Sequence, residues 1–180
     1  AIRQSGSAPL LRAGPLKNWC YYGAEKRWIN GAATNGAGSC VDWFLREVCG
    51  GSASIQALDR ELLKRYKGPM KAPVFLPFQF GERCPGWNDT RKGGWWEPAL
   101  SNERHALYYS VLEGVLFNLY QCYGLLCPPG NAPERILLSG GIVRSAVWVQ
   151  MAADIFGAPM ELTDVEHASI LGAVRIGQKA

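Results

Sequence analysis

The sequence has few charged residues and no long apolar run. Asp, Glu, Lys and Arg make up 19% of the 180 residues, and the formal net charge is +4. A dedicated nucleic-acid binder carries a dense basic surface, so this sparse charge argues against one. A helix that crosses a membrane needs roughly 20 consecutive apolar residues, and no segment approaches that length. We therefore expect neither a nucleic acid nor a membrane as a partner.

The six cysteines lack the spacing of a structural zinc site. There is no Cys-x-x-Cys pair, and only His105 and His167 could add imidazole ligands. A chain that is 48% hydrophobic can bury a core without disulfide staples. We predict free thiols and no bound metal. The cysteines are Cys20, Cys40, Cys49, Cys84, Cys122 and Cys127.

The start of the chain carries neither an initiator methionine nor the basic and apolar series of a signal peptide. It opens Ala1-Ile2-Arg3, so we expect Ala1 to mark a point of cleavage or processing. Length and composition predict a single domain over residues 1–180.

Residue patterns near the start predict a hairpin and then a helix. Aromatic and β-branched runs at 18–22 and 27–31 are separated by a short break, which indicates two paired strands. The glycine-rich segment 31–39 follows. It leads into apolar positions at helical spacing over 41–48, so a glycine-rich loop is expected to open a helix.

The middle of the chain predicts a helix, a strand and a long loop. Ser54 is placed to cap a helix over 55–66. The run 74–76 is typical of a short buried strand. Residues 77–98 are rich in Gly, Pro, Asn and Asp, and a loop of this length often carries function.

Helices and strands alternate in the second half. A helix is predicted from Ser101 or Asn102, as cap, to about 124, followed by a buried strand at 135–139. A helix over 145–156, a strand at 160–162 and a final helix from His167 come next. This alternation predicts an α/β domain with a mixed β-sheet flanked by helices.

Two glycine turns are candidates for ligand binding. Gly140 and Gly141 stand between a predicted strand and a helix, where a missing Cβ and free backbone N–H groups suit a nucleotide. The segment lacks the spacing of the Rossmann and Walker motifs, and a simple turn is the alternative. At 35–42, backbone amides could face phosphate or ribose, and Asp42 could accept a hydrogen bond from a ribose hydroxyl or an amine. A turn capped by Asn35 or Ser39 is the alternative there.

A third motif, Gly81-Glu82-Arg83, lies in the long loop. Its Glu and Arg are expected to pair with neighbours or to remain solvated.

Taken together and in this order, these motifs resemble the carboxy-terminal domain of the FGGY family of carbohydrate kinases. The matching segments cover almost the whole chain: WINGAATNGAG at 28–38, FLPFQFGERCP at 75–85, LEGVLFNL at 112–119, LSGG at 138–141 with WVQMAADIFG at 148–157, and ASILGA at 168–173. Members phosphorylate gluconate, xylulose, glycerol and related polyols with ATP.

The resemblance implies a ribonuclease H-like, actin-type domain that binds ATP across a cleft from a second domain. By motif, Gly141 and Ser145 match positions beside the adenosine, and Gly38 and Asp42 match positions that line the ATP site. The family's amino-terminal domain supplies a phosphate turn, the base for the sugar hydroxyl and most of the sugar pocket. We expect that domain to be absent from this chain, with no catalytic residue and no metal ligand here, and Mg²⁺ bound mainly by the absent domain.

These features predict the ATP-binding domain of a cytoplasmic sugar kinase, inactive as an isolated chain, with gluconate as the preferred substrate. Xylulose or another pentulose is the nearest alternative, and a degenerate member that acts as a binding or regulatory module is a second. One segment, 93–102, departs from the family pattern, because Glu97-Pro98 stands where members have Gly-Leu. Trp95 and Trp96 could belong to an interface, which leaves a homodimer open.

Overall fold

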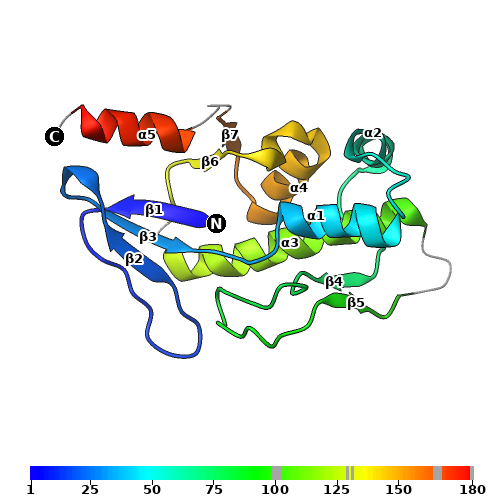
Figure 1. Cartoon of the computed structure of the whole chain (residues 1–180), viewed down its shortest axis with the longest axis horizontal. Coiled ribbons are helices and arrows are strands. Elements are labelled where there is room, and N and C mark those ends of the chain that lie inside the picture. Colours follow the sequence, from blue (N-terminus) through cyan, green and yellow to red (C-terminus); the bar gives the residue numbers. More distant parts are fainter. Residues whose placement is uncertain (99–102, 129, 131, 164–167, 179–180) are drawn as a thin grey trace.

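The computed structural model describes residues 1–98, 103–128, 130, 132–163 and 168–178. It confirms the α/β class. Helix α3 (Arg104–Leu126) runs through the middle of the molecule, and the other elements surround it (Figure 1). It contacts β1, β3, β4, α1, α2 and α4. No helix in the described part of the chain is long and apolar enough to cross a bilayer.

The first sheet is antiparallel and has three strands. The predicted hairpin is confirmed, because β2 (Trp19–Tyr22) pairs with β3 (Trp28–Ala32). β1 (Ile2–Gly6), which the sequence patterns did not indicate, pairs with the other edge of β3. Gly31 on β3 lies opposite Trp19, and a Cβ there would stand 2.1 Å from the indole ring. Glycine at this position lets the Trp19 ring lie over the central strand.

The helices follow their local signals closely. α1 (Gly38–Trp43) continues into a π-helical turn, Phe44–Val48, and α2 (Ile55–Arg65) begins at the predicted cap, where the Ser54 hydroxyl accepts a hydrogen bond from the Ala57 N–H. α4 (Ala146–Phe156) and α5 (Ala168–Gly177) also form.

The long central helix differs from its prediction at both ends. α3 begins at Arg104 and the residue before it, Glu103, makes no side-chain cap; the predicted caps Ser101 and Asn102 lie outside the described residues. The helix continues past Gly124 to Leu126. About half of its residues are buried, whereas Phe117 and Tyr120 in its second half are exposed, so the helix is not terminated by the glycine.

The strands after α2 form two further small sheets. β4 (Val74–Leu76) and β5 (Gly94–Trp96) are antiparallel, so the end of the predicted loop 77–98 is a strand. β6 (Ile136–Leu138) and β7 (Met160–Leu162) are parallel. Parallel and antiparallel pairs therefore both occur, but the described strands are divided among three sheets instead of one.

Two strands that were predicted to be buried are only partly so. In β4, Phe75 is buried, whereas the side chain of Val74 is 56% exposed; in β6, Leu137 is 53% exposed. The reason is the small size of these sheets, since each has two strands in the described chain and only one face packs on the core.

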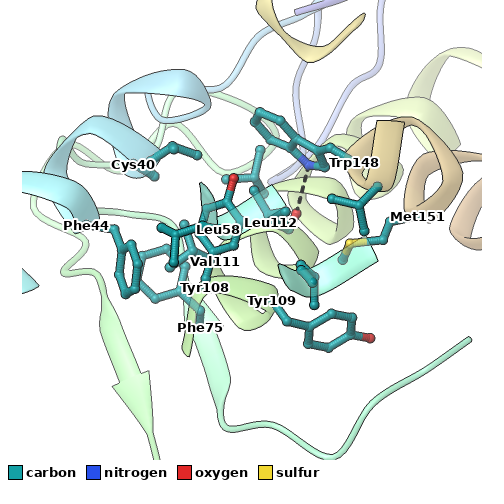
Figure 2. Close-up of a cluster of buried hydrophobic side chains, with 14 of the residues drawn as sticks. Cys40, Phe44, Leu58, Phe75, Tyr108, Tyr109, Val111, Leu112, Trp148 and Met151 are labelled. Atoms are coloured by element: carbon teal, nitrogen blue, oxygen red, sulfur yellow. Dashed lines mark hydrogen bonds between the residues drawn. The ribbon is translucent and has the colours of Figure 1, made fainter. Parts of the chain in front are cut away.

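The main core joins α1, α2, α3, α4 and β4. Figure 2 shows aromatic and aliphatic side chains from these elements in one cluster. The indole N–H of Trp148 donates to the backbone carbonyl of Leu112 over 3.2 Å, which ties α4 to α3. Gly114 makes the α3–β4 contact close, because a Cβ there would lie 2.3 Å from the carbonyl oxygen of Phe75.

Candidate functional site

The first glycine turn leads from β3 into α1. Gly38 is the first residue of α1; it is exposed, and a Cβ at this residue would meet no atom within 4 Å. Its backbone does not adopt the left-handed conformation that favours glycine. Neither packing nor backbone geometry within this chain therefore requires glycine here, which leaves room for a ligand against the main chain.

Asp42 lies four residues after Gly38, on the same face of α1, and is exposed. The capping alternative for this turn is not supported. Ala37 precedes the helix and makes no side-chain cap, while the side-chain amide of Asn35 donates to the carbonyl of Phe80 over 3.0 Å.

The second glycine turn connects β6 to α4. Gly140 has φ +84°, a left-handed conformation in which a side chain would be strained. Gly141 begins a short 3₁₀ turn, Gly141–Arg144, and resembles Gly38: it is exposed, its φ is not positive, and a Cβ on it would have no atom within 4 Å. The first glycine serves the turn, and the second leaves an open backbone surface.

Ser145 closes this turn in a role that sequence reasoning did not assign to it. Ser145 is buried, with 5% exposure, and its hydroxyl accepts a hydrogen bond from the backbone N–H of Trp148 over 3.3 Å. Ser145 is thus the N-cap of α4. Its contact with an adenosine stays a prediction.

Both turns are carried by helices that rest on the same support. Val41 of α1 and Val147 and Met151 of α4 belong to the same large core cluster, and α3 contacts both helices. The two helix starts are therefore fixed by well-packed helices, although the glycines at those starts are exposed.

The loop motif Gly81-Glu82-Arg83 has a structural role in the chain. The side chain of Glu82 is 2% exposed and forms an ion pair with Arg91 over 2.7 Å. The Arg91 guanidinium also lies over the Phe78 ring, 4.7 Å from its centre. Arg83, by contrast, is exposed beside the Trp87 ring. Glu82 therefore pairs with a neighbour, as expected, while Arg83 remains solvated; the partner Arg91 is identified only by the fold of the loop.

All six cysteines are free thiols, as predicted. Within the described residues, no group of three or more His, Cys, Asp or Glu side chains is placed to hold a metal ion. Burial raises the pKa of the Cys40 thiol to about 12, so this side chain at the foot of the first turn is a neutral hydrogen-bond donor at physiological pH.

The departure from the family pattern at Glu97 has a visible backbone consequence. Glu97 follows β5 with φ +52°, where glycine is the usual residue. Of the two neighbouring tryptophans, Trp95 packs against the core and its indole N–H donates to the Ser110 hydroxyl, whereas the side chain of Trp96 is 64% exposed. Trp96 alone of this pair is available for an interface.

Comparison with known proteins finds relatives over most of this chain. The family model for the C-terminal domain of the FGGY family of carbohydrate kinases matches residues 5–180. A gluconokinase of Bacillus licheniformis is 30% identical over 88% of this chain, and a xylulose kinase of Escherichia coli is 32% identical over 86%. The crystal structure of gluconate kinase from Lactobacillus acidophilus superposes on 98% of this chain with a TM-score of 0.85 at 21% identity, and 36% of that chain is covered. The chain spans about a third (33% and 32%) of the length of the two curated relatives.

Proposed function

Because this chain belongs to the FGGY family of carbohydrate kinases, we propose that it is the nucleotide-binding domain of a sugar kinase. The proposed reaction transfers the γ-phosphoryl group of ATP to a hydroxyl of a sugar or sugar acid. Gluconate is the preferred acceptor in this proposal, which the similarity to two gluconokinases, 29% and 30% identical to this chain, supports. The 32% identity to a xylulose kinase supports a pentulose as the alternative.

One observation carries the nucleotide site: Gly38 and Gly141 are exposed glycines that the fold itself does not require. Both stand where a chain leaves a strand and begins a helical turn, so N–H groups are available to oxygen atoms of a ligand. ATP fits such a surface because its ribose and base can approach the main chain where no Cβ intervenes. Asp42, exposed on α1, is placed to accept a hydrogen bond from a ribose hydroxyl or an amine.

The described residues of this chain supply binding and orientation, and we assign no proton transfer to them. The bound nucleotide would supply the phosphoryl group, and Mg²⁺ would neutralise its charge. We propose that the sugar pocket, the base and most of the magnesium contacts come from a second domain, which would occupy part of the length that the relatives have beyond this chain. The free thiols favour a reducing compartment, so we propose the cytoplasm.

Calorimetric titration of the chain with Mg²⁺–ATP and Mg²⁺–ADP tests the proposal. Gly141→Val should remove binding, since the new side chain would occupy the open space beside the turn, where a Cβ meets no atom within 4 Å. The matched control is Gly124→Ala on α3, where a Cβ also meets nothing but no ligand is expected. If Gly141→Val still binds, the nucleotide lies elsewhere. If the wild-type chain does not bind nucleotide at all, the proposal for this chain is contradicted.

The choice of sugar requires kinase assays on the full-length protein with gluconate and xylulose. A higher kcat/KM for gluconate is expected. A higher kcat/KM for xylulose would instead make xylulose the proposed substrate.

A further inference from the structure

The turn that leads into Gly38 is held from outside by the loop that follows β4. Gly36 is buried, and a Cβ on it would lie 2.8 Å from the carbonyl oxygen of Pro77. One residue earlier, the Asn35 side-chain amide donates to the carbonyl of Phe80 over 3.0 Å. The turn and the loop 77–80 are thus in contact on two sides, although they are about 45 residues apart in sequence.

A third contact lies beneath the turn. The Cys40 side chain is completely buried, and its thiol donates to the side-chain carbonyl of Gln79 over 3.4 Å. The loop itself is anchored to the β4–β5 pair. The N–H of Phe78 donates to the carbonyl of Leu76 over 2.9 Å, and Gly93 lies so close that a Cβ there would be 2.5 Å from the backbone nitrogen of Gln79. Through this loop, the turn is connected to the sheet that packs on α3.

The need for outside support follows from the composition of the turn. Gly36, Ala37 and Gly38 have no side chains that could hold a single conformation, and glycine loses more backbone entropy on ordering than any other residue. A binding surface made of such residues is effective only when it is ordered before the ligand arrives. Within the turn, the Thr34 hydroxyl accepts a hydrogen bond from the Gly36 N–H over 3.2 Å. The loop 77–80 adds contacts from outside the turn.

We propose that Asn35 and Gln79 are positioning residues of the nucleotide site: they hold the turn so that Gly38 and Asp42 meet the ligand in a fixed arrangement. This inference rests on the proposed function, since it assigns a support to the same site. Neither residue is proposed to touch the nucleotide.

Asn35→Ala is the cleanest test, because Asn35 is exposed and its removal leaves no buried gap. Loss of the hydrogen bond to Phe80 should weaken binding of Mg²⁺–ADP about fivefold in calorimetric titration, with the same midpoint of urea unfolding. The matched control is Asn88→Ala. Asn88 is an exposed asparagine in the longer segment 77–98, outside the loop 77–80. Its side chain accepts hydrogen bonds from Thr90, so its loss should leave the affinity unchanged.

A readout that does not depend on nucleotide follows the Cys40 thiol. Alkylation of Cys40 by iodoacetamide, measured on its peptide by mass spectrometry, should be faster in Asn35→Ala than in wild type or in Asn88→Ala, because the turn opens more often over the buried thiol. A second pair, Cys40→Ala and Cys40→Ser, tests the contact to Gln79. Serine keeps the donor and should retain the affinity that alanine loses.

The outcomes separate the two claims. If wild type binds nucleotide and Asn35→Ala binds equally well, or loses affinity only together with unfolding stability, the positioning role is wrong. Equal rates of Cys40 alkylation would also overturn it. If wild type binds no nucleotide while Cys40 becomes more reactive in Asn35→Ala, the contact between turn and loop is real and the proposed function fails.

Discussion

Glycines occur in two settings in this molecule: at some positions packing leaves no space for a side chain, and at others it does. At the crossing of α3 and β4, Gly114 is buried and has the Phe75 carbonyl where a Cβ would be. At the two open turns, Gly38 and Gly141 face empty space. The first kind of glycine is explained by packing inside the chain. The second kind is not, and this difference is what directs attention to the open turns as a place for a ligand.

The largest expected effect is a loss of folding stability at high pH, where side chains buried in the core would ionise. Burial raises the pKa of Cys122 on α3 to about 12, and it also raises the pKa of Tyr108, which donates to Asp59. In the unfolded chain the Cys122 thiol ionises near pH 9. Its stabilising contribution to the free energy of unfolding is therefore complete below that pH and is lost as the pH rises from about 9 to about 12. Urea unfolding at pH 11 should show a free energy of unfolding lower by on the order of 2–3 kcal/mol from Cys122 alone.

The control for that experiment is Cys122→Ala, which removes one ionising group from the core. Its free energy of unfolding should fall less steeply between pH 9 and pH 11 than that of wild type. An identical slope would mean that the thiol does not contribute.

A slightly smaller effect is expected when the close crossing is broken directly. Gly114→Val forces a side chain against the backbone of β4, so the free energy of unfolding should fall by about 2 kcal/mol in urea denaturation. Gly124→Ala on the same helix is the matched control, because a Cβ there meets nothing; it should raise stability by about 0.5–1 kcal/mol. Comparable losses in both variants would contradict the distinction between required and unrequired glycines.

The smallest expected effect is the loss of stability when the helix cap at the second glycine turn is removed. Ser145→Ala removes the cap of α4 and should lower the free energy of unfolding by about 1 kcal/mol. Ser54→Ala removes the equivalent cap of α2, which is away from the turn, and should have a similar effect. Affinity for Mg²⁺–ADP separates the two roles of Ser145: a larger loss in Ser145→Ala than in Ser54→Ala indicates that the residue serves the ligand as well as the helix.

Local signals in the sequence predicted the helices well. Ser54 and the apolar spacing after it indicated α2, and the segment from Ser145 to Phe156 matches the limits of α4. These signals act within one or two helical turns, so they can be read without knowing the rest of the fold.

Contacts between distant segments were harder to predict. β1 has no distinctive pattern and becomes a strand because β3 offers it an edge. β5 lies in a segment whose composition is typical of a loop, and Trp95 and Trp96 become strand residues by pairing with β4. The ion pair of Glu82 with Arg91 depends on how the loop folds back.

The candidate site was predicted in part. The two glycine turns were found from sequence because their residue types are distinctive, and the structure shows both to be open. The support of the first turn by Asn35 and Gln79 was missed, since it joins segments about 45 residues apart. Nothing in the spacing of those residues indicates that they meet.

The central place of α3 also has a consequence for the order in which the chain is made on the ribosome. This helix occupies residues 104–126, yet it packs against elements that are synthesised much earlier, β1 and β3 among them. At typical rates of translation, roughly 5–20 s pass between the completion of β3 and the completion of α3. During that interval the first sheet lacks its contacts with α3, so nascent chains of this length should be good clients for chaperones that bind exposed aromatic residues.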